Sequence, residues 1–180
     1  VIGNLGVMCK QLAGLSSHLL AGMSCVEVLQ VSQVKDMKPG QIAVLNVTPD
    51  ADIATGLVSA AAGRMAADAV TWAAKAALRG EVQAVVTAPL HKKALSLAGV
   101  HHPGHTEMLQ AWSHSQGTPP DVRMMLANEE LRVVLVTIHQ SLRSAIEAIT
   151  FDRVLQTIAI THAALKAWGL DRPRIAVAGL

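Results

Sequence analysis

The 180-residue chain is poor in aromatic side chains and has no concentrated charge of either sign. It contains three Trp, one Phe and no Tyr. Its 15 basic and 13 acidic residues are spread along the sequence and give a formal charge of +2. Nucleic-acid binding usually needs a basic patch and often uses aromatic rings that stack on bases. We therefore expect no nucleic-acid partner.

Cysteine is also scarce, and long uncharged apolar runs are missing. Cys9 and Cys25 lie outside any CxxC spacing and provide no disulfide framework, so a reduced, cytoplasmic location is expected. The most apolar long stretch, residues 56–80, is interrupted by Arg64, Asp68 and Lys75. Charges at such spacing argue against a bilayer-spanning helix, so no membrane association is expected.

Several common enzyme signatures are missing as well. The sequence has no GxGxxG, Walker loop, HExxH or GxSxG motif. Standard nucleotide-binding, zincin and hydrolase signatures are therefore absent. The sequence assigns no catalytic acid or base and no cofactor-binding residue.

The residues that are present suffice for one domain-sized core, since 51% of them are apolar. Composition and turn signals predict helices at 54–78, 106–115 and 151–168. The third helix is predicted because Phe151, Leu155, Ile158, His162 and Leu165 fall on one stripe of it. Strands are predicted at 41–47, 82–89, 122–127, 131–139 and 173–180, with a tight antiparallel connection at "NEE", residues 128–130.

Strands that alternate with long helices, together with one hairpin, predict an α/β fold with a mixed sheet. The sequence contains no internal repeat and no linker. We therefore expect residues 1–180 to be a single segment. The apolar start "VIGNLG", without Met, and the strand-like end "RIAVAGL" indicate a piece of a longer chain.

Ligands of open α/β sheets gather beyond the carboxyl ends of strands, which directs attention to polar residues after the predicted strands. Three places qualify: Thr87 with Lys92, the run His105-Thr106-Glu107, and His139. Lys92 is either a solvated charge or a partner for an anionic substrate. The other histidines are expected in loops or as exposed or satisfied helix residues, namely His18, His91, His101, His102, His114 and His162.

The run "PGHTE" at 103–107 has two compatible interpretations. Thr106 can cap a helix whose first turn contains Glu107, with Gly104 allowing the chain to turn. The same geometry directs backbone N–H groups, a hydroxyl and His105 toward one spot, which suits a phosphate or carboxylate.

His139 closes the apolar run "LRVVLVTIH" and also has more than one interpretation. A neutral imidazole there can bind a divalent metal or act as an acid or base near neutral pH. Alternatively, it simply bonds a neighbouring carbonyl. A metal site needs three or more convergent ligands, and one histidine alone does not establish it.

Taken in order, "VVTAPLHKKAL", "PGHTEML", "MMLANEELRVVLVTIHQSLRSA" and "PRIAVAGL" resemble the 4-hydroxythreonine-4-phosphate dehydrogenase family of PdxA-like enzymes. The resemblance runs from about Gly56 to Leu180, and the first 50 residues fit only loosely. It implies an isocitrate/isopropylmalate-dehydrogenase-like α/β/α fold, present here as a fragment.

The resemblance further implies a metal-dependent oxidation of a small phosphorylated hydroxy acid, with NAD or NADP and a divalent ion such as Zn, Mg or Co. The alcohol becomes a ketone, and biosynthetic members then decarboxylate it on the route to pyridoxal phosphate. By motif, His105 and Thr106 correspond to the substrate-binding pair, and His139 corresponds to a metal ligand. The active site is expected at a homodimer interface.

The chain departs from the family pattern in places. Ile138 precedes the metal histidine where the family has Thr, Ser141 replaces a Pro, and Ala88 replaces a Gly. These changes point toward a related substrate, such as a threonate or erythronate 4-phosphate. An N-terminal Gly-Asp-Pro-Ala-Gly motif is missing, and further metal, phosphate and nucleotide contacts are expected beyond Leu180. Residues 1–180 alone are therefore expected not to turn over.

Two other functions remain open from the sequence. One is an acyltransferase of the phosphotransacetylase type, which shares the general fold but uses no metal-bound histidines. The other is a module that binds a phosphorylated acid without catalysis.

Overall fold

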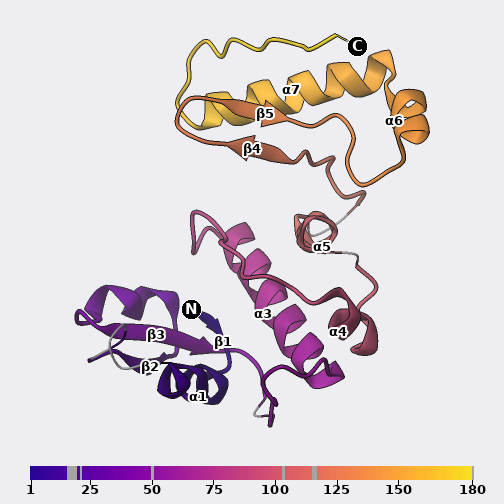
Figure 1. Ribbon diagram of the computed structural model, residues 1–180. Coiled ribbons are helices and arrows are strands. Elements are labelled where there is room, and N and C mark those ends of the chain that lie inside the picture. Colours follow the sequence, from indigo (N-terminus) through magenta and orange to yellow (C-terminus); the bar gives the residue numbers. More distant parts are fainter. Residues whose placement is uncertain (16–19, 21, 50, 103, 115–116, 180) are drawn as a thin grey trace. The chain divides into compact units, whose positions relative to one another are not determined.

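The computed structural model describes residues 1–15, 20, 22–49, 51–102, 104–114 and 117–179 (Figure 1). His18, Pro103, Ser115 and Leu180, which the sequence-based predictions include, lie outside these residues. The described chain forms two compact units, Val1–Pro120 and Asp121–Leu180.

Three parallel strands form the sheet of the first unit. They are β1 (Ile2–Gly3), β2 (Ser24–Val28) and β3 (Gln41–Asn46), in the order β1-β3-β2. Leu45 of β3 pairs with Ile2 on one side and with Val28 on the other. The strand predicted at 41–47 is thus confirmed as the central strand of this sheet.

Apolar side chains cover both faces of β3. Val28, Ala43 and Leu45 are buried together and pack against Trp72 of the helix α3 (Ala60–Leu78). Successive side chains of a strand point to opposite faces, so the fully buried Val44 lies on the other face. The helix α1 (Leu5–Gly14) packs on β2 and β3, and a short 3-10 helix, η1 (Val31–Asp36), follows β2.

The long helix α3 begins later than the sequence predicted. Ser59 is its N-cap, with its hydroxyl accepting a hydrogen bond from the Ala62 N–H at 3.2 Å. The expected start at residue 54 is wrong because a turn precedes the cap, with Gly56 at a φ of 81°. The end is confirmed, since α3 stops at Leu78 and Gly80 follows at a φ of 74°.

Two shorter helices, α4 (Lys92–Leu97) and α5 (His105–Trp112), pack against α3. Ala67 and Val70 of α3 form a buried cluster with Leu95 and Met108. At Gly63, a Cβ atom would lie 2.0 Å from the Ala94 carbonyl oxygen, so α3 and α4 touch backbone to backbone. This cluster fixes α5, which carries the predicted substrate residues, on the side of α3.

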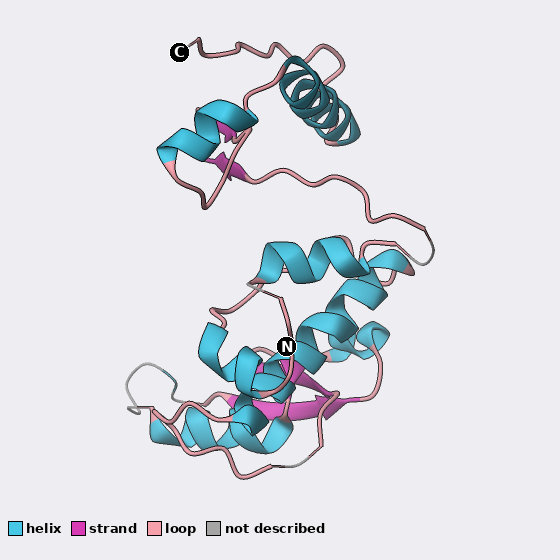
Figure 2. Ribbon diagram, turned by 90° about the vertical axis from the view of Figure 1, so that its right-hand side faces the viewer, coloured by secondary structure: helices cyan, strands magenta, loops and turns pink. Residues whose placement is uncertain are grey.

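Two of the strands predicted from the sequence do not form among the described residues. Residues 82–89 and 173–179 are extended segments without a strand partner among the described residues (Figure 2). Apolar composition predicted a buried strand at 82–89, yet Val86 is 96% exposed. A strand also needs a neighbour for its backbone hydrogen bonds, and composition does not report one.

The second unit contains the predicted hairpin. Its strands β4 (Met125–Ala127) and β5 (Arg132–Val134) are antiparallel, as expected. The Asn128 side chain accepts hydrogen bonds from the Glu130 and Leu131 N–H groups at 3.0 and 2.7 Å, which closes the turn. The strand expected to reach His139 ends at Val134. The parallel and antiparallel strands lie in two separate sheets, so the single mixed sheet is not formed by the described residues.

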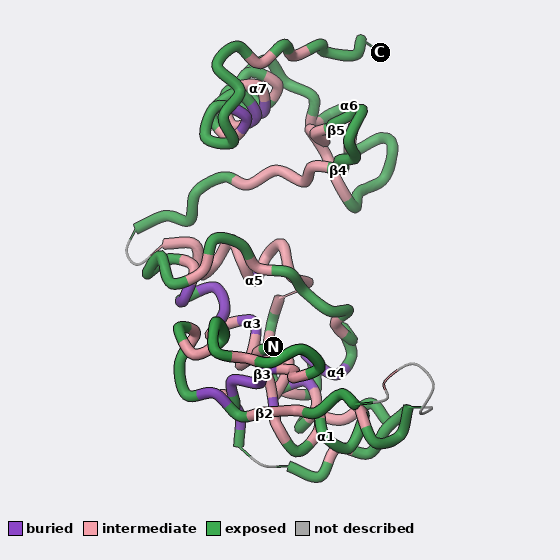
Figure 3. The backbone as a smooth tube through the Cα atoms, turned by 90° about the vertical axis from the view of Figure 1, so that its left-hand side faces the viewer, coloured by how far each residue is buried: buried purple, intermediate pink, exposed green. Residues whose placement is uncertain are grey.

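The helices of the second unit are α6 (Leu142–Ala148) and α7 (Phe151–Ala167). The helix predicted at 151–168 is confirmed, with Thr150 as its N-cap and Gly169 following at a φ of 92°. The stripe that indicated this helix is not its buried face, because Phe151 and Leu155 are exposed. The buried residues of α7 are Thr157, Thr161 and Leu165 (Figure 3).

The buried threonines of α7 donate their hydroxyl hydrogen bonds to backbone carbonyls one turn earlier in the same helix. Thr157 donates to the Arg153 carbonyl at 2.8 Å, and Thr161 donates to the Thr157 carbonyl at 2.7 Å. Arg123, before β4, also donates to the Thr157 hydroxyl at 2.8 Å and connects α7 to the hairpin segment.

Among the described helices, none combines the length and apolar character that crossing a membrane requires.

The close approach at Gly63 leads to a stability prediction. Gly63→Ala places a methyl group against the Ala94 carbonyl, and backbone atoms cannot move aside cheaply. We expect the free energy of unfolding to fall by about 1–3 kcal/mol, measured by urea denaturation. Gly14→Ala is the matched control, since Gly14 ends α1 and the position of its new methyl group is open space, and it should cost nothing. Equal stability of the two variants would contradict the packing argument.

Candidate functional site

The first turn of α5 carries the predicted substrate residues. His105 and Thr106 are its first two residues, and Glu107 follows in the same turn, as predicted. The N-cap is Gly104, so the expectation that Thr106 caps the helix is wrong. Gly104 has a φ of −179°, which is extended backbone that any residue adopts. Gly104 is therefore not required for a left-handed turn.

A glycine cap leaves the start of α5 without a capping side chain. No side-chain hydrogen bond is made at Gly104, whereas Asn4, Ser59, Ser141 and Thr150 each cap their own helices. The first N–H groups of a helix have no partner within the helix, and the helix dipole makes them attractive to anions. The Thr106 hydroxyl belongs to the same turn. The geometry therefore suits a phosphate or carboxylate.

The His105 ring adds a second observation at this turn. Its Nε2 atom is buried and has no hydrogen-bond partner among the described residues. Buried polar atoms are nearly always paired, so an unpaired one needs a physical reason. Nε2 has essentially no accessible surface in this conformation, so a substrate oxygen would supply the missing partner only once the ring turns to expose that atom.

Packing holds α5 in place around this turn. Met108, one turn after Gly104, is fully buried in the cluster with Ala67, Val70 and Leu95. The His102 and Trp112 rings pack edge to face with centroids 5.6 Å apart. His101 is exposed. The neighbouring histidines thus support α5 or face solvent.

The other candidate site in the first unit consists of Thr87 and Lys92. Thr87 lies in the exposed extended segment, and Lys92 opens α4 with an exposed side chain that forms no ion pair among the described residues. His91, expected as a loop histidine, is the N-cap of α4 and accepts from the Ala94 N–H at 3.4 Å through Nδ1. Thr87 and Lys92 are thus both exposed, Thr87 before α4 and Lys92 at its start.

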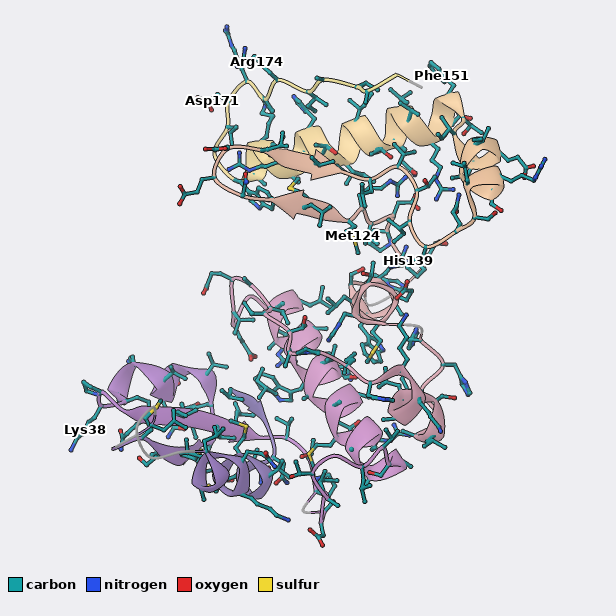
Figure 4. The ribbon with its side chains drawn as sticks, in the orientation of Figure 1. Lys38, Met124, His139, Phe151, Asp171 and Arg174 are labelled. Carbon is teal, nitrogen blue, oxygen red and sulfur yellow. The ribbon has the colours of Figure 1, made fainter. Side chains whose placement is uncertain are left out.

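His139 lies between β5 and α6 with an exposed side chain (Figure 4). Its φ of 52° is the one positive value among the described non-glycine residues. A left-handed conformation costs a non-glycine residue about 1–2 kcal/mol. Ser141 follows and caps α6 by accepting from the Ser144 N–H at 3.2 Å. His139 is therefore held in a strained turn immediately before a capped helix.

The described residues do not by themselves make a metal site. They contain no group of three or more His, Cys, Asp or Glu side chains that could hold one ion. His139 offers one nitrogen donor, and three or more ligands are needed. His105 and Thr106 share one helical turn of the first unit, whereas His139 belongs to the second unit.

A charged hollow in the second unit was not found by reading the sequence. Its volume is about 460 Å³, and its lining residues are Asp121, Arg123, Ala148, Thr150, Asp152, Arg153 and Gln156. The three guanidinium nitrogens of Arg123 donate to Val122, Gln156 and Thr157. Gln156 also donates to Asp121, and Arg153 donates to the Val136 carbonyl at 3.2 Å. These polar groups mainly hold one another in place.

Comparison with known proteins places the whole chain in one family. Residues 1–180 match the family of the pyridoxal phosphate biosynthetic protein PdxA. The 4-hydroxythreonine-4-phosphate dehydrogenase of Beijerinckia indica is 43% identical over 168 residues, which cover 91% of this chain and 48% of that protein. The D-threonate 4-phosphate dehydrogenase of Salmonella typhimurium is 41% identical over 160 residues, covering 86% and 47%.

A solved structure agrees with these relatives. The crystal structure of 4-hydroxythreonine-4-phosphate dehydrogenase from Klebsiella pneumoniae matches with a TM-score of 0.85 and 32% identity, covering 100% of this chain and 53% of that one. The α/β fold class is thereby confirmed. The chain spans about half the length of the relatives it matches. The family match also includes the first 50 residues, which had resembled the family only loosely, so the chain belongs to the PdxA family over its entire length.

Proposed function

We propose that this chain belongs to a dehydrogenase that oxidises a small phosphorylated hydroxy acid, 4-hydroxythreonine 4-phosphate or a 4-phosphorylated relative such as threonate. The observation that carries the proposal is the match of all 180 residues to a family whose relatives are named for these two oxidations. The uncapped start of α5 and the unpaired His105 Nε2 support it from the geometry.

In this proposal, His105 and Thr106 hold an anionic group of the substrate. The imidazole nitrogen and the hydroxyl each provide one hydrogen bond, and the free N–H groups of α5 add their dipoles. Since α5 is fixed by the burial of Met108, these donors are positioned before the substrate arrives. Such preorganisation reduces the entropy lost on binding.

The oxidation itself needs groups that lie outside the described residues. NAD or NADP would accept the hydride, and a divalent ion such as Zn, Mg or Co would polarise the alcohol oxygen. We propose His139 as one ligand of that ion, with its other ligands outside the described residues. The strained backbone at His139 supports this role, because such strain concentrates at functional sites. Decarboxylation after oxidation belongs to the same proposal.

We further propose that the complete protein is a cytoplasmic homodimer. Large apolar side chains remain exposed in the second unit, among them Leu126, Leu142 and Phe151, and a dimer interface would bury surface of this kind. Neither acyl transfer nor binding without catalysis is favoured by a particular contact among the described residues.

The activity proposal is tested on the complete protein that contains this chain. It is screened against 4-phosphorylated threonine, threonate and erythronate, following NADH or NADPH formation with and without a chelator. We expect turnover of one of the three, lost on chelation. Absence of any oxidation, with phospho-acid binding retained, would instead indicate a binding module.

His105→Ala removes one hydrogen bond to a charged substrate group. We expect kcat/KM to fall about 10- to 100-fold, and Thr106→Ala to cause a smaller fall in the same direction. Steady-state kinetics with the preferred substrate measure both. His101→Ala is the matched control, because His101 is exposed nearby, and it should leave kcat/KM unchanged. An equal loss in His101→Ala would remove the case for a specific role of His105.

Backbone strain at His139 is tested by comparing two variants that both lack the imidazole. Glycine adopts positive φ freely and alanine does not, so His139→Gly should be more stable than His139→Ala by about 1 kcal/mol in urea denaturation. Both variants should lose chelator-sensitive activity. Retention of full activity by either would show that His139 is no ligand.

A further inference from the structure

One side of α5 carries both His105 and the residues that fix this helix in the fold. Residues three and four apart lie on the same side of a helix, so His105 shares a side with Met108, Leu109 and Trp112. Met108 is fully buried, and Leu109 and Trp112 pack against the cluster that contains it. The position of His105 therefore depends on how this side of α5 is held.

The segment that leads from α4 into α5 is held at two points before it reaches His102. The Arg64 guanidinium of α3 donates to the Ala98 carbonyl at 2.9 Å. The Val100 N–H donates to the Leu95 carbonyl at 3.0 Å, and the Val100 side chain packs against the same buried cluster. The segment is thus fixed to α3 and α4 as it approaches the start of α5.

His102 then contacts α5 directly. Its half-buried ring meets the Trp112 ring edge to face, with centroids 5.6 Å apart and planes inclined by 65°. Aromatic pairs in this arrangement stabilise a structure beyond the apolar area that they bury. His102 lies two residues before the Gly104 N-cap, whereas Trp112 is the last residue of α5. The ring contact therefore ties the entry of the helix to its far end.

A fixed entry matters because the His105 ring has to turn when a substrate binds. Its Nε2 atom has essentially no accessible surface, so the ring must move before a substrate oxygen reaches that atom. If the backbone moved with the ring, the Thr106 hydroxyl and the first N–H groups of α5 would leave the same spot. A backbone that stays in place keeps these donors together and reduces the ordering that binding requires.

We propose that His102 is a positioning residue for the substrate turn. Through its ring contact with Trp112, it holds the backbone of residues 104–106 in the conformation that binds the anionic group of the substrate. This inference rests on the proposed function, since His105 and Thr106 are the groups that His102 positions. His102 itself takes no part in the chemical step. The contact needs a planar ring at this place, so phenylalanine should replace histidine there.

The first test measures steady-state kinetics of the complete protein with its preferred 4-phosphorylated substrate. His102→Ala should raise KM about 3- to 10-fold, the factor that corresponds to the loss of one aromatic pair. The value of kcat should change less than about twofold, because the turn binds the ground state and the transition state alike. His102→Phe should restore the wild-type KM. His101→Ala is the matched control, since it removes an exposed neighbouring imidazole, and it should leave KM unchanged.

The second test needs neither substrate nor activity. The Met108 N–H donates to the Gly104 carbonyl at 3.2 Å and closes the first turn of α5. Hydrogen exchange of this amide should become about 3- to 10-fold faster in His102→Ala and should keep the wild-type rate in His102→Phe. If the wild-type protein oxidises none of the phosphorylated acids, the proposed function is wrong, and the exchange rates still decide whether His102 holds the turn.

Three results would overturn the positioning role. The first is a wild-type exchange rate and KM in His102→Ala, and the second is a failure of His102→Phe to restore them. The third is a loss confined to kcat, which would place His102 in the chemical step. His102→Leu, which keeps apolar volume without a ring, provides the same comparison if His102→Ala does not fold.

Discussion

The apolar contact between α3 and its neighbours is the constraint on which the first unit depends. Trp72 of α3 joins the core of the parallel sheet, while Ala67 and Val70 join Leu95 and Met108 of the two shorter helices. One helix therefore connects the sheet to the turn that carries His105. Because Met108 is fully buried, rotation of α5 would expose apolar surface at a cost of about 1.5–3 kcal/mol for that side chain alone.

Local signals predicted much of this fold. The helices α3 and α7 and the hairpin were predicted from composition and turn residues, and short-range hydrogen bonds at Ser59, Thr150 and Asn128 fix them in the structure. The segments at 82–89 and 173–179 were not predictable in this way, because a strand exists only where another strand pairs with it. The inward face of α7 was missed because buried threonines satisfy their own hydroxyls within the helix.

The candidate site was likewise predictable only where local sequence determines the structure. The position of His105, Thr106 and Glu107 at a helix start was predictable, since the composition around them favours that start. Identification of Gly104 as the cap was not, because both glycine and threonine occur at N-caps. The unpaired state of His105 Nε2 and the left-handed backbone of His139 are properties of the folded chain, and no residue pattern encodes them.

The strand order β1-β3-β2 also determines when the sheet can form during synthesis. The central strand is the last of the three along the chain, so neither β1 nor β2 can pair with it until Gln41–Asn46 has been made. Chains emerge from the ribosome at about 5–20 residues per second, which leaves these two edges unpaired for a few seconds. The arrival of β3 then allows both pairings of the central strand, with β1 and with β2, to form.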